Sequence, residues 1–156
     1  MKNKQKGFSL IELLIVVAII LIIAAIAIPN LLRSKMAANE ASAVGSMRTL
    51  NTAAVTYSTT YGGYPGALSS LAPATPATST SADLVDSVLA GGTKSGYVFS
   101  WSGGTPDASG NIQSYCIYAH PVTAGTTGQR YFYTNQSGVI RANSAATADI
   151  NSTPIS

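Results

Sequence analysis

The chain has 156 residues, enough for one modest domain with an appended segment, and its formal net charge is +3. Three of its nine Lys and Arg residues lie within residues 1–7 and the other six balance six Asp and Glu, so the positive charge is local and does not indicate a specific nucleic-acid partner. The single cysteine, Cys116, excludes an internal disulfide, and no Cys/His cluster suggests a zinc site.

The first predicted element is an apolar helix preceded by a short basic stretch. Residues 8–28 are mainly apolar and carry one charge, Glu12. As a helix they would span about 31 Å, which matches the roughly 30 Å hydrocarbon core of a bilayer and favours a membrane anchor. A secretory signal peptide cut after Ala27 is an alternative. Against it, the apolar run exceeds the usual ~7–15 residues and carries an acid near its start.

A third interpretation follows from the residues at the start of the apolar run. The sequence KGFSLIE at residues 6–12, followed by LLIVVAIILIIAAIAIP, resembles the class III signal of type IV pilins and type II secretion pseudopilins. The glycine, the phenylalanine, the glutamate four residues after it and the proline that ends the run all fall where that family has them. The resemblance is close over residues 1–30 and looser as far as residue 65.

In that family a basic leader ends in glycine, a membrane peptidase cuts after it, and the new N-terminal phenylalanine is methylated. The resemblance therefore implies a cleaved leader at residues 1–7, with the cut between Gly7 and Phe8. It also implies N-methylation of Phe8 and a role for Glu12 in assembly. Residues 8–35 would be the helix that lies in the membrane and later in the filament core.

Glu12 is tolerable in lipid and costly in a protein core. By helical rise it lies about 6 Å from the end of the apolar span, within reach of the headgroups. Packed against other copies, its carboxylate would need a buried partner. The nearest cation would be the Phe8 amino group created by cleavage, with an attraction of roughly 4 kcal/mol at ~4 Å before desolvation. Glu12 is therefore expected to select register between subunits. The alternative is a local role, because a helix N-terminus favours an acid by ~0.3–1 kcal/mol.

Pro29 follows the apolar run and predicts a helix break or kink, because proline lacks the N–H that an α-helix requires. An ordinary helix end is equally compatible with it. Beyond Pro29, apolar residues recur at helical spacing and predict an amphipathic helix, residues 36–61, packed on the head of the protein. Glu40 and Arg48 are expected to be plain solvated charges.

Residues 62–96 are expected to form an exposed loop region with short helical turns at 68–71 and 83–89. Within it, the Pro/Ala/Thr/Ser-rich tract 72–82 is compatible with a bare loop and with an O-glycosylated one. Ser, Thr, Gly, Ala and Asn are abundant over residues 62–156, a composition that suits a secreted surface.

The C-terminal half is predicted to form strands at four segments of alternating pattern, namely 97–101, 114–122, 130–134 and 138–143. Turns rather than helical crossovers connect them, so residues 97–142 should form an antiparallel sheet with one face on the amphipathic helix. Residues 143–156 are expected to be a polar tail. The predicted fold class is α+β, a long N-terminal helical stem packed on a small antiparallel β-sheet head, which is the pilin fold that the resemblance implies.

The sequence indicates no enzyme, metal site or cofactor. His120 is the only histidine, it precedes Pro121, and no spacing suggests a Ser-His-Asp or Cys-His arrangement. We therefore interpret the chain as a non-enzyme that is itself the substrate of a processing peptidase.

The resemblance implies a structural subunit, the major pilin of a type IV pilus or a related extracellular filament. Its implied partners are copies of itself in a helical filament, the prepilin peptidase, and an inner-membrane assembly platform with a cytoplasmic ATPase. The precursor would lie in the inner membrane and the mature subunit on the cell surface.

Two alternatives stay open. The first is the major pseudopilin of a type II secretion system; those proteins commonly carry an acidic, calcium-binding loop near the C-terminus, where this chain has only Asp149. The second is a secreted monomeric binding module cut after Ala27. The chain also lacks the C-terminal disulfide loop of classical Gram-negative pilins, so roles tied to that loop do not transfer to it.

Overall fold

The computed structural model describes residues 7–155, which form two compact units. The N-terminal unit ends at Lys35, and the second unit, called the head below, begins at Met36. One helix, α1 (Leu10–Tyr61), contributes its first half to the N-terminal unit and its second half to the head. Residues 1–6 of the expected leader lie outside the described residues.

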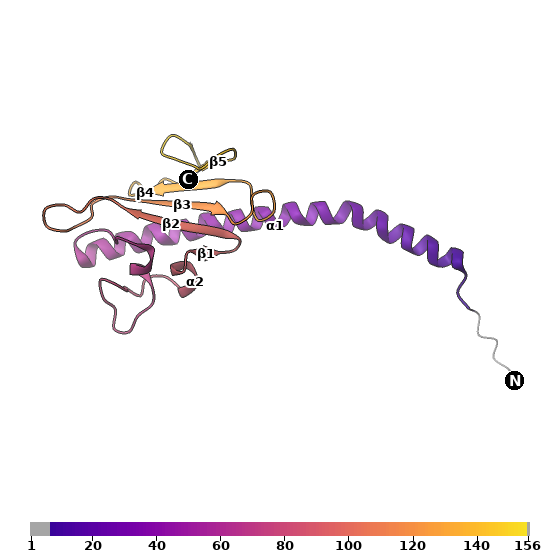
Figure 1. Cartoon of the computed structure of the whole chain (residues 1–156), viewed down its shortest axis with the longest axis horizontal. Coiled ribbons are helices and arrows are strands. Elements are labelled where there is room, and N and C mark those ends of the chain that lie inside the picture. The colour runs from indigo at the N-terminus through magenta and orange to yellow at the C-terminus, as the bar shows by residue number, and fades with distance from the viewer. Residues whose placement is uncertain (1–6, 156) are drawn as a thin grey trace. The chain divides into compact units, whose positions relative to one another are not determined.

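The head combines the second half of α1 with a six-stranded sheet (Figure 1). Its other elements are η1 (Leu68–Leu71), α2 (Ser87–Ala90), β1 (Thr93–Lys94), β2 (Tyr97–Gly103), β3 (Tyr115–Pro121), β4 (Tyr131–Asn135), β5 (Arg141–Asn143) and β6 (Thr153–Pro154). Every neighbouring pair of strands is antiparallel, and the order in the sheet is the order in the chain. The α+β prediction is confirmed.

The core of the head lies between the apolar stripe of α1 and one face of the sheet. On the helix, Met47 and Leu50 are completely buried. On β3, Ile117 is equally buried, whereas the residues that alternate with it, Cys116 and Tyr118, are half-buried. The 3.6-residue period of the helix and the two-residue period of the strands thus place the apolar side chains in one cluster.

The region 62–96 is more structured than expected. Leu71 and Leu89 are almost fully buried in the core, so the region is not simply an exposed loop, although most of the tract 72–82 is exposed. The short helix α2 begins after Asp86, whose side chain accepts a hydrogen bond from the Leu89 N–H. The sequence analysis missed these few buried side chains because the composition of residues 62–96 is polar on average.

The prediction of a polar tail at residues 143–156 is also wrong in part. Residues 153–154 form β6, the last strand of the sheet, and the Ile155 N–H donates to the Ile140 carbonyl at 2.9 Å. Ala148 in the preceding loop is fully buried. A strand of two residues has no alternation to detect, so only its pairing with β5 reveals it.

The prediction that Glu40 is a plain solvated charge is wrong. Its side chain is paired, and the residue is only 8% exposed. One carboxylate oxygen accepts the Nε–H of Arg130 at 2.7 Å. The other accepts the backbone N–H groups of Gln129 and Arg130, at 2.9 and 3.2 Å. Burial by itself raises the pKa of Glu40, but these hydrogen bonds and the Arg130 charge outweigh it and hold the pKa below its usual value of 4.5. Glu40 therefore ties the helix to the segment that leads into β4.

We expect Glu40→Gln to destabilise the head by about 1.5–3 kcal/mol at neutral pH, because it removes charge-assisted hydrogen bonds from a buried site. Since the pKa is lowered on folding, the contribution of Glu40 is present above pH 4.5 and is lost as the pH falls through the folded-state value. Thermal unfolding of the full chain in detergent, followed by near-ultraviolet circular dichroism, measures both effects. The gap between wild type and variant should narrow in acid. Asp83→Asn is the matched control, because Asp83 is exposed and should change stability by less than about 0.5 kcal/mol.

Candidate functional site

The junction between Gly7 and Phe8 is open in the structure. Phe8 is 85% exposed, and a Cβ atom added to Gly7 would meet no heavy atom of residues 7–155 within 4 Å. The fold itself therefore does not require glycine at position 7. The Phe8 side of the junction is open to another molecule.

Glu12 makes a hydrogen bond at the N-terminus of its own helix. Its Oε2 accepts the backbone N–H of Ser9 at 2.9 Å, and the Leu13 N–H donates to the Ser9 carbonyl at 3.2 Å. Ser9 therefore precedes the first turn, and Glu12 reaches back to it in the way of the capping box S-x-x-E. Sequence reasoning proposed a local role for Glu12 through the helix dipole but missed Ser9, although the spacing of the two residues signals this motif.

The first half of α1 presents an apolar surface on every side. Glu12 is the only ionisable side chain between Phe8 and Leu32, and Arg33 and Lys35 follow this stretch as exposed cations. Between residues 8 and 32, the exposed large apolar side chains are Phe8, Leu10, Ile11, Leu13, Leu14, Ile15, Val16, Val17, Ile19, Ile20, Leu21, Ile22, Ile23, Ile26, Ile28, Leu31 and Leu32.

By length and composition, α1 is the one helix within the described residues that could cross a membrane, and no residue in its most apolar stretch is buried. An apolar surface of this extent does not stay in contact with water in a soluble monomer. It therefore needs lipid or other protein chains around it.

Pro29 does not break the helix in the single chain. Helical structure is continuous from Leu10 to Tyr61 with Pro29 inside it, which corrects the expected break for the isolated subunit. Proline withholds one donor, which leaves the carbonyl of Ala25 without its usual partner four residues on. The regular helical turns on both sides hold the helix across this one defect, so Pro29 is a weak point rather than an end.

The other candidate residues show no arrangement of a catalytic kind. His120 is half-buried on β3, at the position paired with Val98. Within residues 7–155, no three His, Cys, Asp or Glu side chains gather as a metal site would require.

Comparisons with known proteins give matches to part of the chain. Residues 2–28 match the family described as the prokaryotic N-terminal methylation motif. The chain is similar to the type IV wide pilus major component PilA4 of Thermus thermophilus, with 62% identity over 40 residues, which are 26% of this chain and 30% of that protein. It is also similar to the type IV major fimbrial protein FimA of Dichelobacter nodosus, with 56% identity over 52 residues, which are 31% of this chain and 33% of that protein.

The matched region spans about a third of the length of each of these relatives. No solved structure matched the chain. The motif and the relatives support a type IV pilin family, which is a family of structural proteins and not of enzymes. The α+β architecture of a long apolar helix and an antiparallel sheet agrees with this assignment.

Proposed function

We propose that this chain, which has the N-terminal region of a type IV pilin, is the major structural subunit of a type IV pilus or a closely related filament. The precursor is anchored in the inner membrane by the first half of α1 and is cleaved after Gly7. The Phe8 amino group is methylated, and the mature subunit then polymerises through α1 into a surface filament.

One observation carries this proposal, the continuous apolar surface of the first half of α1, which has a single carboxylate near its start. A membrane anchor needs the apolar residues, and Glu12 would serve it only as the cap that bonds Ser9. A filament core needs both, because copies of the helix bury the apolar side chains against one another and the carboxylate can pair with the new amino group of a neighbour.

The energetics indicate why assembly needs more than contact between helices. Each large aliphatic side chain gains about 1.5–3 kcal/mol when it leaves water. Lipid already supplies most of this gain to the precursor, so moving from bilayer to filament changes the apolar term little. Extraction therefore requires external work, which we assign to an assembly platform with a cytoplasmic ATPase.

The C-terminal loop supports a pilin more than a calcium-binding pseudopilin. Asp149 carries the one side-chain carboxylate there, and its Oδ1 accepts local hydrogen bonds from the Asn151 N–H at 3.0 Å and the Ser152 hydroxyl at 2.9 Å. Calcium takes about 6–8 oxygen ligands, often from several carboxylates, and this loop offers one.

Isolation of surface filaments tests the proposed function. The main subunit should be this chain, and Edman sequencing should begin at methylated Phe8. A sequence that begins at Ile28 would support a secreted module cut after Ala27. Filaments with a different main subunit would contradict the role of major pilin.

In the filament, we expect α1 to lose its regular helical structure around Pro29, although the helix is continuous there in the single chain. Regular hydrogen bonding should be lost within residues 24–33, because the carbonyl of Ala25 already lacks a donor and the packing of neighbouring stems can favour a longer, locally melted segment. Cryo-electron microscopy maps of wild-type and Pro29→Ala filaments make the comparison. The variant, which regains the donor, should show an unbroken helix; an unbroken helix in wild-type filaments would refute the expectation.

A further inference from the structure

The head contains a small open pocket that the proposed assembly does not use. Its volume is about 230 Å³, below the ~300–1,000 Å³ of pockets that enclose drug-sized ligands, so it fits one small ring. The residues that line it come from the end of α1, the turns that follow, and the loop between β2 and β3: Tyr57, Tyr61, Gly63, Tyr64, Gly66, Ser79, Gly110, Asn111 and Ile112.

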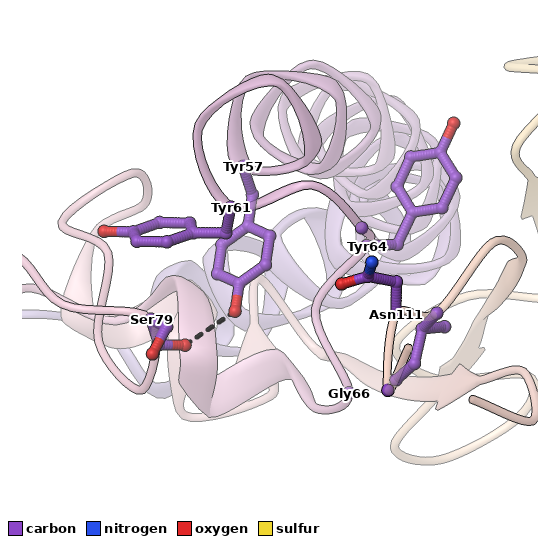
Figure 2. Close-up of a pocket in the computed structure, with 9 residues that line it drawn as sticks. Tyr57, Tyr61, Tyr64, Gly66, Ser79 and Asn111 are labelled. Carbon is purple, nitrogen blue, oxygen red and sulfur yellow. Dashed lines mark hydrogen bonds between the residues drawn. The ribbon is translucent and has the colours of Figure 1, made fainter. Parts of the chain in front are cut away.

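Two aromatic rings form one side of the pocket, and an amide faces them. The rings of Tyr57 and Tyr61 pack against each other, with centroids 4.6 Å apart and planes at 44°, and Tyr61 is the more accessible of the two because Tyr57 is only 8% exposed. Figure 2 shows Asn111 and Gly66 across the pocket from these rings, while the ring of Tyr64 turns away. Three of the lining residues are glycines, which leaves main-chain atoms accessible between the two sides.

The polar groups of the pocket are held in place and still have capacity for a ligand. The Tyr57 hydroxyl donates to the Ser79 carbonyl at 2.7 Å, which leaves its oxygen free to accept (Figure 2). The side-chain carboxamide of Asn111 has no hydrogen-bond partner within the described residues, although its backbone N–H is fixed by Asp107 at 3.0 Å. Asp107 also accepts the Ser109 N–H and the Gln113 amide, so the loop that carries Asn111 is preformed.

The chemistry of the lining selects the class of ligand. None of the lining residues is charged, so the pocket offers no partner to an anion or a cation. An aromatic cage for a quaternary ammonium group needs rings on several sides of the cation, whereas Tyr57 and Tyr61 pack on each other. The half-buried ring of Tyr61 opposite a free carboxamide instead matches a sugar ring, which has an apolar C–H face and hydroxyl groups that both donate and accept.

We propose that this pocket binds one ring of a neutral saccharide, packed against the ring of Tyr61 and hydrogen-bonded to the carboxamide of Asn111. The filament subunit would then also be a carbohydrate-binding protein, at a site contained within the head.

Titration of the full-length ¹⁵N-labelled chain in a zwitterionic detergent without a sugar headgroup tests this inference by NMR. The probes are methyl β-glucoside, methyl β-galactoside and N-acetylglucosamine, with N-acetylneuraminate and tetramethylammonium as charged comparisons. At least one neutral sugar should shift the Asn111 side-chain signals and the Gly66 amide signal saturably, and the charged probes should not.

Asn111→Ala should weaken that sugar's binding by about tenfold, because it removes the hydrogen bonds of an otherwise unpartnered amide. Tyr61→Ala should weaken binding at least as much, while Tyr131→Ala, a half-buried tyrosine on β4 outside the pocket, should leave it unchanged. Asn111→Ala keeps the test decisive if Tyr61→Ala does not fold. The inference is overturned if no neutral sugar shifts these signals, if only tetramethylammonium does, or if Asn111→Ala binds as well as wild type.

Discussion

Replacing Glu12 with leucine should leave membrane insertion and cleavage after Gly7 intact and should abolish or sharply reduce filaments. The variant segment is more apolar, so lipid accepts it at least as well. In the filament, the Phe8 amino group would lose its proposed counter-charge, and an unpaired buried ion costs about 3–5 kcal/mol. Electron microscopy of filaments on cells, with an immunoblot for mature subunit, measures both parts of this result.

The hydrogen bond between Glu12 and Ser9 makes a sharper control available. Glutamine at position 12 keeps the capping-box geometry, since the motif accepts Glu or Gln, and removes only the charge. If pairing with a neighbour's amino group is what matters, Glu12→Gln should assemble nearly as poorly as Glu12→Leu.

If the cap and the helix dipole account for Glu12, the outcome differs. Loss of the dipole interaction costs under about 1 kcal/mol. Glu12→Gln would then form near-normal filaments, and even Glu12→Leu would retain many. Abundant, regular filaments from both variants would exclude Glu12 as the residue that selects register.

Replacing Gly7 with valine should produce a membrane-bound precursor that is not cleaved and no filaments. We expect the cause to lie in the peptidase, because within the described residues a Cβ atom at position 7 meets nothing within 4 Å and Phe8 is exposed. A peptidase site shaped around glycine has no room for a branched Cβ. The mobility of the subunit on a denaturing gel, with N-terminal sequencing, measures the result.

Gly7→Ala is the matched control, because it adds one methyl group without branching. It should be cleaved more slowly than wild type and faster than Gly7→Val. A mature-size band at normal yield from Gly7→Val would show that this junction is not the cleavage site, and sequencing of that band would locate the true one.

The sequence alone determined those features whose signals are local. Local patterns over a few turns identified the N-terminal motif, the apolar run and the apolar stripe of the second half of the helix. The 3.6-residue period of the helix determines which face each side chain of the stripe occupies. The alternation in residues 97–101 and 114–122 likewise identified β2 and β3 and their buried faces. Each of these patterns states which side of an element meets the core.

Only the tertiary structure decided which distant residues each face of a helix or strand contacts. Glu40 is buried and paired because Arg130, far away in the chain and itself partly exposed, reaches it, and no local pattern encodes that partner. The strand β6 exists because β5 offers an unpaired edge. The pocket of Tyr57, Tyr61 and Asn111 joins the end of a helix to a loop between strands. Contacts between distant segments depend on how the chain closes on itself, and hydrophobic periodicity carries no information about that closure.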